Sequence, residues 1–140
     1  MQKNMKKTIL TVEDGDGIRR LIRMTLEYMG FLVLEANGGE QGLEMAREHK
    51  PDLVLMDVRM PGVSGLTACE VMRADPQLRN VPVVMLSAAG SEDDISAGMA
   101  SGAKAYLVKP FQPVELIELV TRLIEEAAQP ESAAAGTAHR

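Results

Sequence analysis

The chain has 140 residues, 46% of them hydrophobic and 25% charged, and its formal net charge is −5 at pH 7. This length and composition predict one globular domain with its own core, and they exclude a largely disordered chain. The negative charge argues against nonspecific nucleic-acid binding, which depends on cationic contacts to phosphates. The lone Cys69 cannot pair within the chain, so no oxidising compartment is indicated, and we expect a cytoplasmic protein with a buried thiol.

The basic start of the chain is followed by an apolar run that stops at Glu13 and Asp14. This run is too short for a signal peptide or a membrane span. We therefore expect a flexible segment over residues 1–6 and a first buried strand over Ile9–Val12. A helix is predicted next, ending near Gly30, because apolar residues recur at the spacing of a core-facing stripe. The residues of this stripe are Ile18, Leu21, Ile22, Leu26 and Met29.

Four more short runs predict strands, and most are apolar on both faces, as in a parallel sheet covered by helices. They are Phe31–Leu34, Leu53–Met56, Val83–Leu86 and Ala105–Val108. Helical patterns lie after each of them: Glu40–Glu48, Gly65–Ala74, Ser91–Ala100, and a final stripe of Leu116, Ile117, Val120, Leu123, Ile124 and Ala127. Ser91 and Asp94 resemble a pair of capping residues at the start of the fourth helix.

The alternation of five strands with five helices predicts an α/β fold of the (βα)5 type, in which helices cover both faces of a parallel sheet. We expect this domain to span residues 7–127. Residues 128–140 are rich in Ala, Ser, Gly and Pro and have no apolar stripe, so a disordered tail is expected there. That tail is too short to be an output domain.

Every predicted strand except the second is followed at its carboxyl end by polar residues of a particular kind. These are Glu13, Asp14, Asp57, Ser87 and Lys109. In a doubly wound sheet such ends meet at the edge where ligands bind. Three carboxylates repel one another unless a cation lies among them, and oxygen ligands without Cys or His favour a hard ion such as Mg²⁺. A lysine and a hydroxyl beside them suit a phosphoryl group.

Four motifs, in this order, resemble the receiver domains of bacterial two-component response regulators. They are Glu13-Asp14, the run from Val54 to Gly62, the run from Val84 to Ala88, and the run from Tyr106 to Phe111. The resemblance covers residues 7–127. It implies a doubly wound, flavodoxin-like sheet with strand order 2-1-3-4-5, and a stand-alone regulator of the chemotaxis type.

The resemblance also implies a role for each polar residue. Asp57 is the phosphoacceptor, which takes a phosphoryl group from a sensor histidine kinase or a histidine phosphotransfer protein. Mg²⁺, with Mn²⁺ as an alternative, is held by Glu13, Asp14, Asp57 and the backbone carbonyl of Arg59. The phosphoryl group is bound by Ser87, Ala88 and Lys109.

Switching is implied to begin when Ser87 shifts toward the phosphoryl group and Tyr106 rotates inward. The face formed by the fourth helix, the fifth strand and the fifth helix then changes shape for an unidentified downstream protein. The same resemblance implies a cis peptide bond at Lys109–Pro110. Such a switch is not an enzyme beyond self-catalysed phosphorylation and dephosphorylation, and neither nucleic-acid binding nor membrane insertion is expected.

Two side chains flank the route of water to the acyl phosphate: Arg59 follows the acceptor by two residues, and Ala89 follows Ser87 by two. We hypothesise that these positions, Arg59 above all through its fixed charge and bulk, alter the lifetime of the phosphoryl group.

Three alternatives stay open. Phosphatases that form an aspartyl phosphate typically carry a second Asp two residues after the nucleophile, where this chain has Arg59. A nucleotide or flavin binder is suggested by Gly15 and Gly17, but Arg20 replaces the third glycine of the fingerprint. The third alternative is a pseudo-receiver, a module of the same fold that never takes phosphate.

Overall fold

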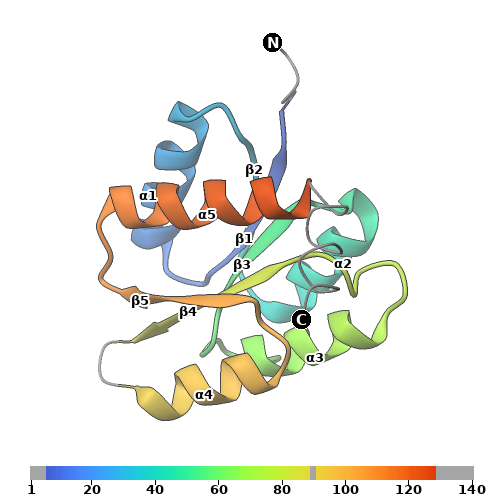
Figure 1. Cartoon of the computed structure of the whole chain (residues 1–140). Coiled ribbons are helices and arrows are strands. Elements are labelled where there is room, and N and C mark those ends of the chain that lie inside the picture. The colour runs from blue at the N-terminus through green and yellow to red at the C-terminus, as the bar shows by residue number, and fades with distance from the viewer. Residues whose placement is uncertain (1–5, 89–90, 129–140) are drawn as a thin grey trace, which may run out of the picture.

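The computed structural model describes residues 6–88 and 91–128, which form a parallel sheet of five strands with helices on both faces (Figure 1). The strand order is β2-β1-β3-β4-β5, so the predicted α/β class and strand order are confirmed. The strands are β1 (Thr8–Val12), β2 (Leu32–Ala36), β3 (Leu53–Asp57), β4 (Val83–Ala88) and β5 (Ala105–Lys109). The helices are α1 (Asp16–Tyr28), α2 (Gly39–His49), α3 (Gly65–Ala74), α4 (Glu92–Ala100) and α5 (Pro113–Ala127).

The expectations for residues 1–6 and 128–140 concern segments that lie almost wholly outside the described residues. Within the described part of the chain, no helix combines the length and the apolar character that crossing a membrane requires.

Two hydrophobic cores form because successive strand side chains point to opposite faces of the sheet. On one face the strands pack against α1 and α5. On the other they pack against α2 and α3, and α4 lies beside α3 against β4 and β5. The first core contains Ile9, Leu55, Val84, Ile22, Leu26, Leu116 and Val120, and the second contains Leu10, Val54, Met85, Ala46, Cys69 and Met72. The prediction of a buried Cys69 thiol is confirmed.

The two edge strands are less buried than the central ones. All five residues of β3 are buried, whereas β2 and β5 each have one strand neighbour and are exposed in part. Burial on both faces was therefore wrong for Ala105–Val108, where Tyr106 is 44% exposed. The second strand also begins and ends later than predicted, because its pairing with β1 runs from Leu32 to Ala36.

The apolar stripe of α1 is narrower than its sequence pattern indicates. Ile22 and Leu26 are fully buried, but Leu21 and Met29 are exposed, so their prediction as core residues was wrong. Only the centre of a helix stripe meets the sheet when a neighbouring helix covers one flank alone, as α5 does here. The predicted end of the helix at Gly30 is confirmed by its positive φ of 95°.

Candidate functional site

The site lies where the order of the strands reverses. β1 and β3 are neighbours, with β2 beyond one and β4 beyond the other. Glu13 and Asp14 directly follow β1, and Asp57 is the last residue of β3. Ser87 lies near the end of β4, and Lys109 ends β5. All five strand-end residues therefore lie at one edge of the sheet, where α/β folds bind ligands.

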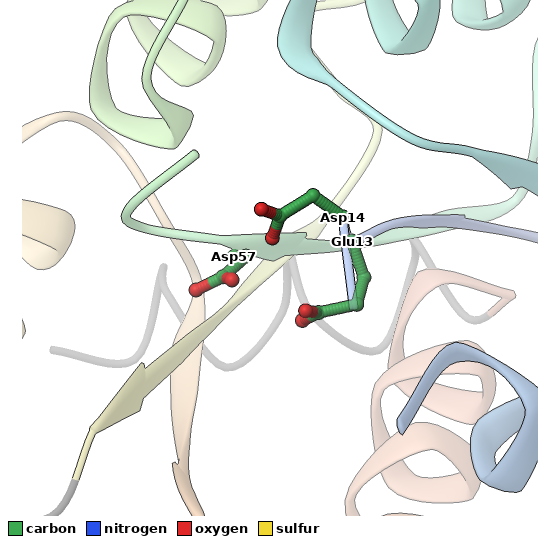
Figure 2. Close-up of side chains that lie close together, drawn as sticks. All are labelled: Glu13, Asp14 and Asp57. Atoms are coloured by element: carbon green, nitrogen blue, oxygen red, sulfur yellow. The ribbon is translucent and has the colours of Figure 1, made fainter. Parts of the chain in front are cut away.

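Three carboxylates meet at this edge (Figure 2). One oxygen from each of Glu13, Asp14 and Asp57 lies within 4.8 Å of the others. Glu13 and Asp57 are buried, whereas Asp14 is exposed. Acidic groups held this close, open to solvent on one side and with oxygen donors alone, fit a small hard cation that keeps part of its water shell.

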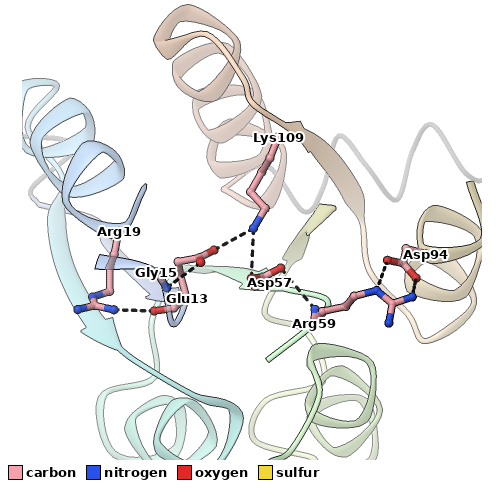
Figure 3. Close-up of polar contacts among 7 residues, drawn as sticks. All are labelled: Glu13, Gly15, Arg19, Asp57, Arg59, Asp94 and Lys109. Carbon is pink, nitrogen blue, oxygen red and sulfur yellow. Dashed lines mark hydrogen bonds and ion pairs between the residues drawn. The ribbon is translucent and has the colours of Figure 1, made fainter. Parts of the chain in front are cut away.

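Lys109 reaches into this acidic cluster from β5. Its Nζ lies 3.2 Å from Asp57 Oδ2 and 3.5 Å from Glu13 Oε1 (Figure 3). One ammonium against three carboxylates leaves the group negative, so the cluster still attracts a cation. Lys109 also lies beside the carboxylate that the sequence singles out as the acceptor.

Glu13 is held by the backbone around it as well as by Lys109. The Gly15 N–H donates to Glu13 Oε2 at 2.9 Å, and Arg19 Nη1 donates to the Glu13 carbonyl oxygen at 2.7 Å. Burial raises the pKa of the Glu13 carboxyl above its usual 4.5, and the charge of Asp57 raises it further, although the Gly15 and Lys109 contacts oppose both effects. The folded, metal-free protein therefore disfavours the charge on Glu13.

This pKa shift predicts how stability depends on pH. A carboxyl with a higher pKa in the folded state holds more protons there than in the unfolded chain, so stability falls as pH rises through that window. With a chelator present to remove metal ions, Glu13→Gln at pH 7 is expected to unfold at a temperature a few degrees higher than wild type, because glutamine carries no charge to bury. Thermal unfolding at several pH values should show this advantage shrinking toward pH 4.5, and an advantage unchanged by pH would contradict the prediction.

Arg59 turns away from the acidic cluster (Figure 3). Its N–H makes a long 3.4 Å hydrogen bond to Asp57 Oδ1, but its guanidinium pairs with Asp94 on α4. The predicted capping pair of Ser91 and Asp94 was therefore wrong. The Ser91 side chain makes no capping hydrogen bond within the described residues, and the Asp94 carboxylate accepts from Arg59 instead.

The remaining predicted residues lie around the same edge. Ser87 is buried, and its hydroxyl has no hydrogen-bond partner among the residues that the structure describes, so it is free to bind an incoming acceptor. Ala88 is exposed beside it. The Tyr106 side chain is partly exposed, and the Lys109–Pro110 peptide bond is cis. Ala89 lies outside the described residues.

Comparison with known proteins identifies the family. Residues 9–121 match the model of the response regulator receiver domain. The chain belongs to this family. Receiver domains are phosphoacceptor switches of two-component systems and bind Mg²⁺ at an acidic site, to which the cluster of Glu13, Asp14 and Asp57 corresponds.

Individual relatives agree with this assignment. The DNA-binding response regulator MtrA of Mycolicibacterium smegmatis is 40% identical over 116 residues, which cover 83% of this chain and 50% of that protein. A putative response regulator from Chloroflexus aurantiacus has a TM-score of 0.84 at 34% identity, over 86% of this chain and 98% of that one. The receiver domain of the sensor histidine kinase PA1611 from Pseudomonas aeruginosa, solved with magnesium in its active-site cleft, has a TM-score of 0.81 at 32% identity. That match covers 86% of this chain and 98% of the other.

Sequence reasoning did not predict the contacts that two residues of this receiver domain, Arg19 and Asp94, make beside the site. Arg19 lies six residues after Glu13, and Asp94 lies 35 residues after Arg59. Neither separation is a recognisable motif. Their roles follow from how α1 and α4 pack beside the edge of the sheet.

Proposed function

We propose that this chain is a Mg²⁺-dependent phosphoacceptor switch whose acceptor is Asp57. The observation that carries the proposal is the convergence of three carboxylates within 4.8 Å, two of them in contact with Lys109. The oxygen-only donors favour Mg²⁺, with Mn²⁺ as an alternative, and the backbone carbonyl of Arg59 is the further protein ligand.

The chemistry assigned to the residues is a phosphoryl transfer. A carboxylate oxygen of Asp57 attacks the phosphorus of a phosphohistidine, the new P–O bond forms, and the P–N bond to the imidazole breaks. Bound Mg²⁺ would neutralise charge on the phosphoryl oxygens. Lys109 pairs with one of these oxygens, while the Ser87 hydroxyl and the Ala88 N–H donate to another.

The output is a change of shape on the face of α4, β5 and α5. Ser87 moves to bind the phosphoryl group, and Tyr106 turns from its exposed position into the space that Ser87 vacates. Phosphorylation favours the active conformation only by interacting differently with the two states. The phosphodonor is a sensor histidine kinase or a histidine phosphotransfer protein, and the reader of the face is a second protein.

The chain spans about half the length of the curated relatives it matches, and MtrA is named as DNA-binding. The stand-alone architecture, the lack of nucleic-acid binding and the cytoplasmic location therefore remain expectations for this chain. So does the role of Arg59 and Ala89 in phosphoryl lifetime, which autodephosphorylation of Arg59→Ala would test.

Intact mass measurement tests the proposal. Wild-type protein incubated with Mg²⁺ and a small phosphodonor such as acetyl phosphate is expected to gain the mass of one phosphoryl group. Chelation of the metal is expected to prevent the gain. No adduct with any donor would favour a pseudo-receiver, whereas continuous release of phosphate at many turnovers per minute would favour a phosphatase.

A further inference from the structure

The Arg59–Asp94 contact joins the loop after Asp57 to the first turn of α4. Arg59 Nε lies 2.9 Å from Asp94 Oδ2, and Arg59 Nη2 lies 2.9 Å from Asp94 Oδ1. Two parallel N–H···O bonds fix both the position and the orientation of a guanidinium. The Asp94 side chain is 8% exposed and the Arg59 side chain 77%, so the acid is the rigid partner and the arginine the one it holds.

Without this contact, Arg59 would have another strong attractor close by. Its own backbone N–H already points at Asp57 Oδ1. Lys109 pairs with Glu13 and Asp57, and its single charge leaves the cluster of three carboxylates negative. A long side chain that is mostly exposed has room to turn toward these carboxylates. A guanidinium placed there would occupy carboxylate oxygens that a metal needs and would repel a divalent cation.

We propose that Asp94 is a positioning residue of the metal site, because it holds the guanidinium of Arg59 against α4 and so keeps a competing positive charge away from the cation. The inference rests on the proposed Mg²⁺ site. The Asp94 contact explains why Arg59, only two residues after the acceptor, does not prevent a metal ion from binding to the carboxylates. It also assigns a function to a buried acid that the capping pattern does not explain.

The expected effect is on Mg²⁺ affinity. A unit charge about 7 Å from a divalent cation in water-like surroundings changes the cation's Kd roughly three- to tenfold. Asp94→Ala is therefore expected to weaken Mg²⁺ binding by this factor. The measurement is a Mg²⁺ titration of the unphosphorylated chain, followed by amide chemical shifts or by calorimetry, so no phosphorylation is needed.

Two further variants separate positioning from other effects. Asp93→Ala removes the same charge from the same turn of α4 at an exposed position, and it is expected to leave Mg²⁺ affinity within twofold of wild type. Arg59→Ala combined with Asp94→Ala removes both the competitor and its holder, and it is expected to restore the affinity to the wild-type value or above. Far-ultraviolet circular dichroism confirms that each variant is folded.

The outcomes are distinct. Arg59→Ala is expected to strengthen binding clearly more in the Asp94→Ala background than in wild type, where Asp94 already holds the guanidinium away, and this difference supports the proposal. Equal effects of Arg59→Ala in the two backgrounds would show only the sum of two charges and would overturn it, as would unchanged affinity in Asp94→Ala. If wild type itself binds no Mg²⁺, the proposed metal site is overturned, and the positioning role of Asp94 is overturned with it.

Discussion

Asp57→Asn is expected to gain no phosphoryl group under conditions that label wild type completely. The amide that replaces the carboxylate has no anionic oxygen to attack phosphorus, whereas its size and its place at the end of β3 are unchanged. The loss should therefore be total within the sensitivity of intact mass measurement. The chain should stay folded, because Lys109 keeps Glu13 as a partner.

A matched control and a binding measurement sharpen this test. Asp93→Asn removes a carboxylate from an exposed position on α4 and is expected to label like wild type. Mg²⁺ binding to Asp57→Asn should be weakened but measurable, since Glu13 and Asp14 remain. An adduct of unchanged yield in Asp57→Asn would place the acceptor elsewhere, and peptide mapping would then locate it.

Gly65→Ala is expected to lower the stability of the fold more than any other substitution proposed for this chain. Gly65 begins α3 with its backbone against the end of β3, and its N–H donates to the Val58 carbonyl oxygen at 3.0 Å. A methyl group at Gly65 would overlap the Asp57 carbonyl oxygen and would lie 2.9 Å from the carbonyl carbon. Because both atoms belong to the backbone, no side-chain rotation relieves the overlap.

The clash must move either α3 or the acceptor itself. We expect the free energy of unfolding to fall by about 1–3 kcal/mol, as in overpacked cores, and Mg²⁺ affinity to fall with it where Asp57 is displaced. Gly17→Ala is the matched control: a methyl group there meets nothing within 4 Å, so stability should be unchanged or rise by about 0.5–1 kcal/mol. Urea unfolding compares the two, and equal stabilities would show that the close approach at Gly65 is not required.

Much of the fold could be predicted from local patterns. Each short apolar run became a strand and each periodic run a helix, and α3 begins and ends at the predicted residues, Gly65 and Ala74. The alternation then leaves few topologies, because parallel strands need helical crossovers of one hand. What local patterns could not distinguish was an edge strand from a central one, since the apolar residues of β5 look like those of β4 until the neighbours are known.

For the candidate site too, part of the arrangement could be predicted from the sequence and part could not. Sequence alone determined which chemical groups follow each strand, and hence that carboxylates, a hydroxyl and a lysine would meet if the sheet were doubly wound. That inference needs only the rule that parallel strands end at one edge. This rule was enough to place Asp57 and the other strand-end polar residues at one edge of the sheet, and the family match supports their arrangement as a receiver site.

Tertiary structure alone decided the contacts between segments far apart in the chain. The pairing of Arg59 with Asp94 across 35 residues, and the closeness of Gly65 to the Asp57 backbone, depend on where α4 and α3 pack against the sheet. Periodicity and composition indicate whether a residue lies in a strand or a helix and whether its side chain is buried. They carry no information about which distant side chain fills the space beside it, because that is set by the packing of whole elements.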